Sequence, residues 1–260
     1  MNDDNLPKIN VNADLSKTIE KAYDDTLQKP LDSTSSIVST VLDFFHNTVL
    51  YPMQKYNLYA KSKLDRYALE LQERAKKIPE ENLVSPRVNI LGPTIEGLKY
   101  NLDEDYIKEM FTNILISDMD SAKQSKVLPS YIEVVKQLSH DDANFLKTLK
   151  DSSTYKNGFF CLELRINNII NNKYILLEYI DNDTKIKRFN VYNVSNIILD
   201  NLIRLRLINI PSDEFFVNQS IYEKMLDMTK KNYNTTNIRH NKRILYITDF
   251  GKNFIDICLS

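Results

Sequence analysis

One short stretch of the chain concentrates residue types that can do chemistry. Four of them fall within ten positions of a chain that has only three histidines: Glu133, His140, Asp141 and Asp142. Carboxylates beside a histidine can bind a metal ion or form an acid–base pair. The same residues also occur at helix starts, where carboxylates face unpaired backbone N–H groups. The spacing of the neighbouring residues decides between these interpretations.

The spacing favours helix capping, because two serines stand three positions before an acidic residue. Ser130 and Glu133 form an S-x-x-E pattern directly after Pro129, and Ser139 and Asp142 repeat it as S-x-x-D. In such a capping box the two side chains satisfy each other's backbone N–H groups at the start of a helix. Apolar residues follow both boxes at helical spacing. We therefore expect these four residues to be structural helix caps.

A metal site would need more ligands than this stretch supplies. The other two histidines, His46 and His240, are distant in sequence, and the chain contains no H-x-x-x-H or C-x-x-C pattern. We therefore expect no metal, no cofactor and no catalytic residue.

Composition narrows the functional classes further. The net charge of −1 gives no overall attraction to nucleic acid or anionic lipid. Only four glycines occur, and neither GxGxxG nor GxxxxGK[ST] is present, which argues against a nucleotide-binding fold. The first residues are acidic and polar rather than a secretory signal, and only Cys161 and Cys258 carry thiols. These features predict a reduced, cytoplasmic protein without a disulfide.

The first part of the chain predicts an arm followed by helices. Residues 1–34 hold more acidic than basic residues and few apolar ones, which is typical of a loosely ordered arm. Residues 35–50 predict an amphipathic helix with this apolar face: Ile37, Val38, Val41, Leu42, Phe45 and Val49. A membrane-surface helix would carry basic residues on its polar face, but none lies between Lys29 and Lys55. A core-facing helix is the favoured interpretation.

Residues 53–78 predict a long helix with a coiled-coil-like seam. Its apolar positions step by three, four or seven: Tyr56, Ala60, Leu64, Tyr67, Leu71 and Ile78. The seam predicts packing on a neighbouring helix or on a second copy of the chain. Residues 84–91 read as a loop that enters the next helix at Gly92-Pro93. Another amphipathic helix follows Asp103.

The last part of the chain predicts a mixed domain. Residues 159–167 and 173–181 read as a strand hairpin, and 192–211 read as a helix that runs into a strand. Residues 243–258 read as a strand, a turn and a short helix. This order resembles a winged-helix domain with an inserted hairpin. We predict an α+β, mostly helical protein with an arm at 1–34, a helical domain at 35–138 and a winged-helix-like domain at 139–260.

A basic loop is expected over residues 228–252, which hold six lysines and arginines against Asp249 alone. Five of these cations are candidates for phosphate contact: Lys230, Lys231, Arg239, Lys242 and Arg243. The recognition-like helix that precedes them is mostly apolar beside Arg204 and Arg206, which is poor for reading base edges. Nucleic-acid binding is therefore an alternative that we do not favour.

A longer pattern resembles a known family. The matching residues are Gly92-Pro93, Glu96, Leu98, Glu104, Met110, Phe111, Leu115, Asp120, Pro129, Ser130, Glu133, Lys136, Gln137, Leu138, Ser139 and Ala143. This pattern resembles the core signature of the abortive infection alpha (Abi-alpha) family, bacterial proteins linked to defence against phage. The family often has His before the proline and Phe after the serine, where this chain has Leu128 and Tyr131. The resemblance implies a role in defence and little chemistry.

We therefore expect a non-enzymatic antiphage protein that acts through contacts with a phage or host protein, as a sensor or an effector, and self-associates through the 53–78 helix. The alternative is a winged-helix regulator that binds nucleic acid through the 228–252 loop. A membrane-perturbing effector that uses the 35–50 helix is the least favoured hypothesis.

Overall fold

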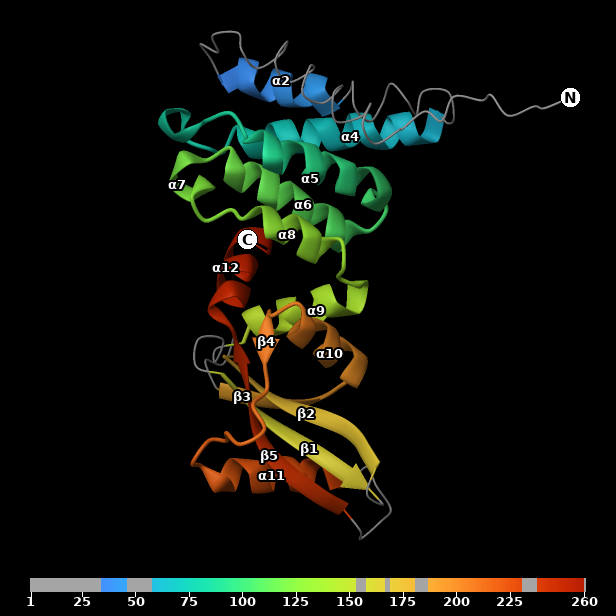
Figure 1. Ribbon diagram of the computed structural model, residues 1–260, viewed down its shortest axis with the longest axis vertical. Coiled ribbons are helices and arrows are strands. Elements are labelled where there is room, and N and C mark those ends of the chain that lie inside the picture. The colour runs from blue at the N-terminus through green and yellow to red at the C-terminus, as the bar shows by residue number, and fades with distance from the viewer. Residues whose placement is uncertain are drawn as a thin grey trace, which may run out of the picture. The chain divides into compact units, whose positions relative to one another are not determined.

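Figure 1 shows a computed structural model of the chain, which describes residues 34–45, 58–152, 158–166, 169–180, 187–230 and 238–259. The chain divides into two compact units, Met1–Glu133 and Val134–Ser260. Each unit buries its own set of apolar side chains. The predicted arm lies outside the described residues, apart from Thr34. The fold is α+β and mostly helical, as predicted.

Helices make up most of the described part of the first unit. In chain order they are α2 (Thr34–Phe45), α4 (Leu58–Ala75), the 3₁₀ helix η2 (Glu80–Asn82), α5 (Val88–Asn101), α6 (Asp105–Asp118), α7 (Ser121–Gln124) and α8 (Pro129–Val135), which crosses the unit boundary. In Figure 1, α2, α4, α5 and α6 form successive layers. The core of this unit lies between these layers and includes Leu71, Ile95 and Phe111.

Helix α2 is the described part of the amphipathic segment predicted over 35–50. Ile37, Val41 and Phe44 are buried, and α2 packs against α4. The apolar stripe of this helix therefore faces the protein core, as the favoured interpretation expected. Among the described residues, no helix has the length and apolar character needed to cross a membrane.

Helix α5 begins earlier than the sequence predicted. It begins at Val88 and contains Pro93, so the expected loop up to Gly92-Pro93 is wrong. A proline inside a helix removes one backbone hydrogen bond and costs about 3 kcal/mol. The first turns of α5 bury Ile90 and Leu91 completely, and this burial explains why the helix extends before the proline.

The second unit combines helices with one antiparallel sheet. Its elements are α9 (His140–Lys150), β1 (Phe159–Ile166), β2 (Ile169–Ile180), β3 (Lys187–Val194), α10 (Asn196–Arg204), β4 (Ile208–Asn209), α11 (Gln219–Lys230), β5 (Ile238–Ile247) and α12 (Asp249–Cys258). The strand order is β3-β2-β1-β5-β4. Helix α11 covers one face of this sheet, where Leu162 and Leu164 of β1 pack with Tyr222 and Met225.

The winged-helix prediction is not confirmed. The predicted hairpin is present as β1 and β2, but β3 extends it and was not predicted. Helix α11 lies in the connection between β4 and β5 and was not predicted either. The basic segment 228–252 is not a loop: it contains the end of α11, all of β5 and the start of α12, while 231–237 lie outside the described residues.

The predicted capping box of Ser139 and Asp142 is present at the start of α9, whereas α8 begins one residue before Ser130. At the start of α9, Ser139 Oγ accepts from the backbone N–H of Asp142 at 3.2 Å, and the Asp142 carboxylate accepts from the N–H of Ser139 at 2.8 Å. Helix α8 begins at Pro129, so Ser130 lies inside the first turn of the helix rather than before it. Proline suits a first helical position because no N–H is needed there.

Replacing Asp142 with alanine is expected to lower the free energy of unfolding by about 1 to 2 kcal/mol. The Asp142 carboxylate is buried and also accepts from Asn201 Nδ2 of α10 at 2.8 Å, so the substitution removes a cap and a contact between helices. Urea unfolding measures the loss, and Asp141→Ala, at the exposed neighbouring position, is the control. Equal stability of the two variants would contradict the capping assignment.

Candidate functional site

The first unit contains a cavity of about 180 Å³ beside α4. Its lining combines both charge signs with a tyrosine: Arg66, Tyr67, Glu70, Leu102, Asp103, Asp105 and Lys108. The lining comes from α4, from the α5–α6 connection and from the first turns of α6. Such a mixed set of side chains can bind a small polar molecule or simply hold the helices together.

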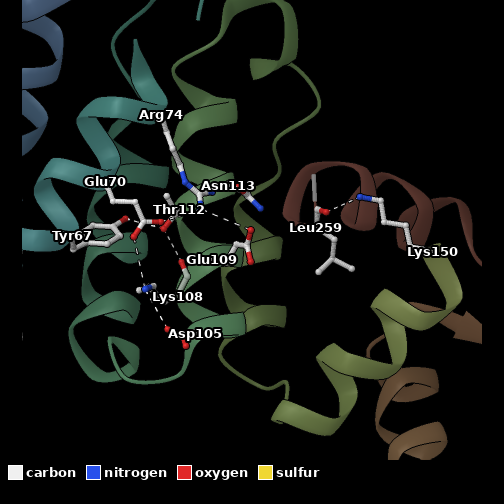
Figure 2. A network of polar contacts seen from close by, with 10 residues as sticks. All are labelled: Tyr67, Glu70, Arg74, Asp105, Lys108, Glu109, Thr112, Asn113, Lys150 and Leu259. Atoms are coloured by element: carbon white, nitrogen blue, oxygen red, sulfur yellow. Dashed lines mark hydrogen bonds and ion pairs between the residues drawn. The ribbon is translucent and has the colours of Figure 1, made fainter. Parts of the chain in front are cut away.

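Three charged side chains of this cavity, Glu70, Asp105 and Lys108, pair with one another, as Figure 2 shows. Lys108 Nζ lies 3.8 Å from Glu70 and 3.3 Å from Asp105. Arg74, one turn further along α4, lies 3.0 Å from Glu70 and donates to Asn113 Oδ1 at 2.9 Å. The pairs therefore connect α4 to α6. Exposed pairs of this kind contribute about 1 kcal/mol or less each.

Tyr67 is one of the buried polar side chains of this network. Thr112 Oγ1 lies 3.2 Å from the Tyr67 hydroxyl and 2.7 Å from the backbone carbonyl of Lys108. Burial raises the pKa of Tyr67, and the Thr112 contact lowers it by less. The side chain is therefore a neutral phenol at physiological pH and is no general base. The arrangement is structural, and it gives no support to catalysis at this cavity.

The described members of the predicted oligomer seam are buried within the first unit. Tyr67, Leu71 and Ile78 are 2%, 1% and 7% exposed. Helix α4 packs against α2 and α6, so these positions serve a neighbour within the chain. Tyr56 and the side chains of Ala60 and Leu64 lie outside the described part. Self-association therefore stays a prediction, and these three buried side chains do not supply a free surface for it.

Four of the five predicted phosphate-contacting residues are described, and these four divide into two groups. Lys230 ends α11 and Arg239 lies on β5, where both are exposed. Lys231 lies outside the described residues. Lys242 and Arg243 are half-buried on β5 and are bound by groups of the chain itself. Of the five predicted residues, only Lys230 and Arg239 are both described and exposed.

The bound cations hold β5 to its neighbours. Lys242 Nζ donates to Gln219 Oε1 at the start of α11 and lies 5.8 Å from the centre of the Tyr222 ring. Arg243 donates to the backbone carbonyl of Ser212 and lies 3.7 Å from the buried carboxylate of Glu163. Because these contacts already use both side chains, they reduce what either cation can offer to a phosphate.

The sequence interpretation missed an apolar surface next to β5, which residues 212–218 form and which we call the Phe215 segment. Phe215 is 52% exposed and Val217 is 91% exposed. Phe216 between them points inward, with its ring centre 4.3 Å from that of Phe160. In the sequence, the three consecutive apolar residues from Phe215 to Val217 suggest a buried segment. The structure shows that the first and third side chains are exposed while the second is turned inward.

The Phe215 segment is held in place although it has no regular secondary structure. The carbonyl of Ser212 accepts from Arg243, and Glu214 accepts from the Tyr246 hydroxyl at 2.7 Å. The Phe216 backbone N–H donates to the Tyr222 hydroxyl at 3.1 Å. Three anchors within five residues fix the direction in which Phe215 and its neighbour face solvent. A surface that is already ordered loses less entropy on binding a partner.

The two cysteines are buried, and the two described histidines lie on separate elements, α9 and β5. Burial raises the pKa of Cys161 to about 12, and burial also raises the pKa of Cys258. His140 is exposed on α9, with Nε2 3.3 Å from Asn144, and His240 is exposed on β5. Among the described residues no cluster of three or more His, Cys, Asp or Glu side chains could hold a metal ion.

Comparison with known proteins gives one match. A family model described as abortive infection alpha matches residues 60–258. This range includes the polar cavity, the capped helix α9, the whole sheet and the Phe215 segment. No curated protein and no solved structure matches the chain.

Proposed function

The chain belongs to the abortive infection alpha family, and we propose that it defends a bacterium against phage by contacting another protein, without catalysis. Membership of this family implies the role in abortive infection. The protein-contact mechanism is our own addition and rests on the surface of the second unit. We place the partner, a phage or host protein, in the cytoplasm, where the two thiols would stay reduced.

The observation that carries the mechanism is the ordered apolar display of the Phe215 segment. Exposed aromatic and aliphatic side chains that sit together mark protein interaction sites more often than isolated ones do. Phe215 and Val217 face solvent on a backbone that three hydrogen bonds fix. The two half-buried cations beside this segment are bound inside the chain, which weakens the case for a phosphate surface. These features favour a protein partner over nucleic acid.

The state of the thiols supports a mechanism without a cysteine nucleophile. Only a thiolate is a good nucleophile, and a free cysteine in water ionises near pH 8.5. Cys161 and Cys258 are completely buried, and burial raises the pKa of both. Both therefore remain protonated at physiological pH.

Ellman's reagent is expected to modify the native protein at least about 100-fold more slowly than the urea-unfolded chain at pH 8. Because the pKa of Cys161 is higher in the folded state, the thiols favour folding fully below about pH 8.5, and this contribution is lost as pH rises toward 12. Rapid modification of one thiol in the native protein would identify a reactive cysteine and would contradict the non-enzymatic mechanism.

Phage challenge tests the proposed defence directly. Cells that express the chain and cells with an empty vector are infected with a panel of phages at low and high multiplicity. We expect fewer plaques on the expressing cells for at least one phage, together with death or growth arrest of the infected cells at high multiplicity. Equal plaque numbers for every phage, at a verified level of soluble protein, would overturn the proposal.

A further inference from the structure

One edge of the sheet in the second unit is open over most of its length. Strand β5 pairs with β1 from Ile238 to Leu245, whereas β4 pairs with β5 only at Tyr246 and Ile247. In the described part of the chain, no other strand lies beside β5 from Ile238 to Leu245. Such an edge offers unpaired backbone groups to another extended chain.

The direction of the backbone groups on this edge follows from one hydrogen bond. The backbone N–H of Thr248, the residue after β5, donates to the carbonyl of Leu207, the residue before β4, at 3.1 Å. This bond lies on the side of β5 away from β1, because β4 pairs with β5 on that side. Alternate residues of an antiparallel strand direct both backbone groups to the same side. Ile238, His240 and Lys242 therefore direct their backbone groups outward, whereas those of Arg239 and Asn241 face β1. The outward N–H and C=O groups have no partner among the described residues.

The open edge is also positively charged. Strand β5 contains no Asp or Glu. The side chains of Arg239 and of Lys230, the last residue of α11, form no hydrogen bond or ion pair with any described residue. Partial burial lowers the pKa of His240, and the positive charges of Lys242 and Lys230 lower it further.

We propose that the edge of β5 from Ile238 to Lys242 binds an extended, acidic segment of a partner protein by strand addition. The proposal rests on the proposed function and names the chemistry of its partner. Antiparallel backbone pairing would use the outward N–H and C=O groups, and acidic side chains would lie near Arg239 and Lys230.

Two other occupants fit this edge less well. A second copy of β5 would bring Arg239, Lys242 and Arg243 against the same residues, and like charges opposite one another destabilise strand pairing. A nucleic-acid phosphate accepts hydrogen bonds but cannot donate them, so it would leave the outward carbonyls unpaired. An acidic strand satisfies both the donors and the acceptors of the edge.

Binding of synthetic peptides to the full chain tests the proposal. The probes are fluorescent eight-residue peptides with Val or Thr at alternating positions and Glu, Ser or Lys at the others, together with single- and double-stranded DNA and RNA oligonucleotides. We expect the Glu peptides to bind at least about tenfold more tightly than the Ser peptides, and the Lys peptides not to bind. Amide exchange should show new protection at His240 and Lys242.

Substitutions at two neighbouring positions separate charge from backbone pairing. Arg239→Ala removes the cation, and His240→Pro removes an outward N–H, with His240→Ala as its side-chain control. We expect Arg239→Ala to weaken Glu-peptide binding about fivefold, and the His240→Pro variant to bind about tenfold more weakly than the His240→Ala variant. If the proline variant unfolds, Lys230→Glu with Arg239→Glu replaces it, and the charge-matched control is Arg66→Glu with Lys77→Glu in the first unit.

The outcomes distinguish this proposal from the proposed function. Failure of every Glu peptide to bind below about 1 mM would overturn strand addition. Preferential binding of an oligonucleotide, or equal binding by the His240→Pro and His240→Ala variants, would overturn it as well. In each case, defence against phage by the unmodified chain would leave the proposed function standing. Loss of defence in the phage challenge would overturn that function whatever the peptides do.

Discussion

Replacing Gly251 with alanine is expected to destabilise the second unit by about 3 kcal/mol. A Cβ atom at Gly251 would lie 2.0 Å from the backbone carbonyl oxygen of Leu207 and 2.8 Å from its carbon. That oxygen accepts from the Thr248 backbone N–H at 3.1 Å, and so it cannot move without breaking the start of α12. A clash with held backbone can be relieved only by moving the helix away from its neighbour.

Two alanine substitutions serve as controls for this prediction. A Cβ at Gly97 would lie 2.5 Å from the tip of the Phe111 ring, which is a side chain and can shift. Helix propensity favours alanine over glycine by about 1 kcal/mol, so we expect a smaller loss for Gly97→Ala. Asp256→Ala, at an exposed position of α12, should be nearly neutral. Urea unfolding followed by amide exchange assigns each loss to its unit, and a Gly251→Ala variant as stable as Asp256→Ala would contradict the packing.

Replacing Arg87 with methionine is expected to cost about 3 to 5 kcal/mol in the first unit. The carboxylate of Asp118 is completely buried, and Arg87 binds it through Nε at 2.8 Å, Nη2 at 2.6 Å and its backbone N–H at 2.7 Å. Arg87 also donates to the carbonyls of Gln124 and Val127 at 3.1 and 2.7 Å. The methionine would leave one buried charge and two carbonyls without this partner.

A double-mutant cycle separates the interaction energy of the Arg87–Asp118 pair from the packing of the aliphatic parts of the two side chains. Burial raises the pKa of Asp118 and the Arg87 bonds lower it, so the isolated carboxylate is the costly group. We therefore expect Arg87→Met with Asp118→Leu to be less destabilised than Arg87→Met alone. Arg66→Met, at an exposed arginine of the same unit, is the control. A double variant that loses the sum of both single losses would contradict a coupled buried pair.

Local patterns predicted the elements whose signals lie within one stretch of sequence. The capping box at Ser139 marks the start of α9, and the apolar runs at 159–167 and 173–181 correspond to β1 and β2. These signals depend on the residues that form the element and need no distant partner. The sequence therefore predicted the mostly helical α+β class without the correct topology.

The features that were missed depend on partners distant in sequence. The basic segment 228–252 read as a loop because its charges were counted without their partners. Arg243 forms an ion pair with Glu163, which lies 80 residues earlier in the sequence. The two residues come together because β5 pairs with β1 in the sheet. The exposed apolar side chains at Phe215 and Val217 are held by hydrogen bonds to α11 and β5. No periodic pattern in the local sequence predicts these bonds. Tyr67, similarly, read as part of an oligomer seam because its neighbours on α6 are not adjacent in sequence.

The most direct test of the account is the plating efficiency of a sensitive phage on cells that express a Phe215→Ser, Val217→Ser variant. The control variant is Leu69→Ser with Tyr100→Ser, which alters two exposed apolar side chains in the first unit. Both variants must match the native chain in soluble level and urea midpoint. We expect the Phe215 variant to lose protection and the control to keep it. Full protection by the Phe215 variant would contradict a mechanism based on this surface.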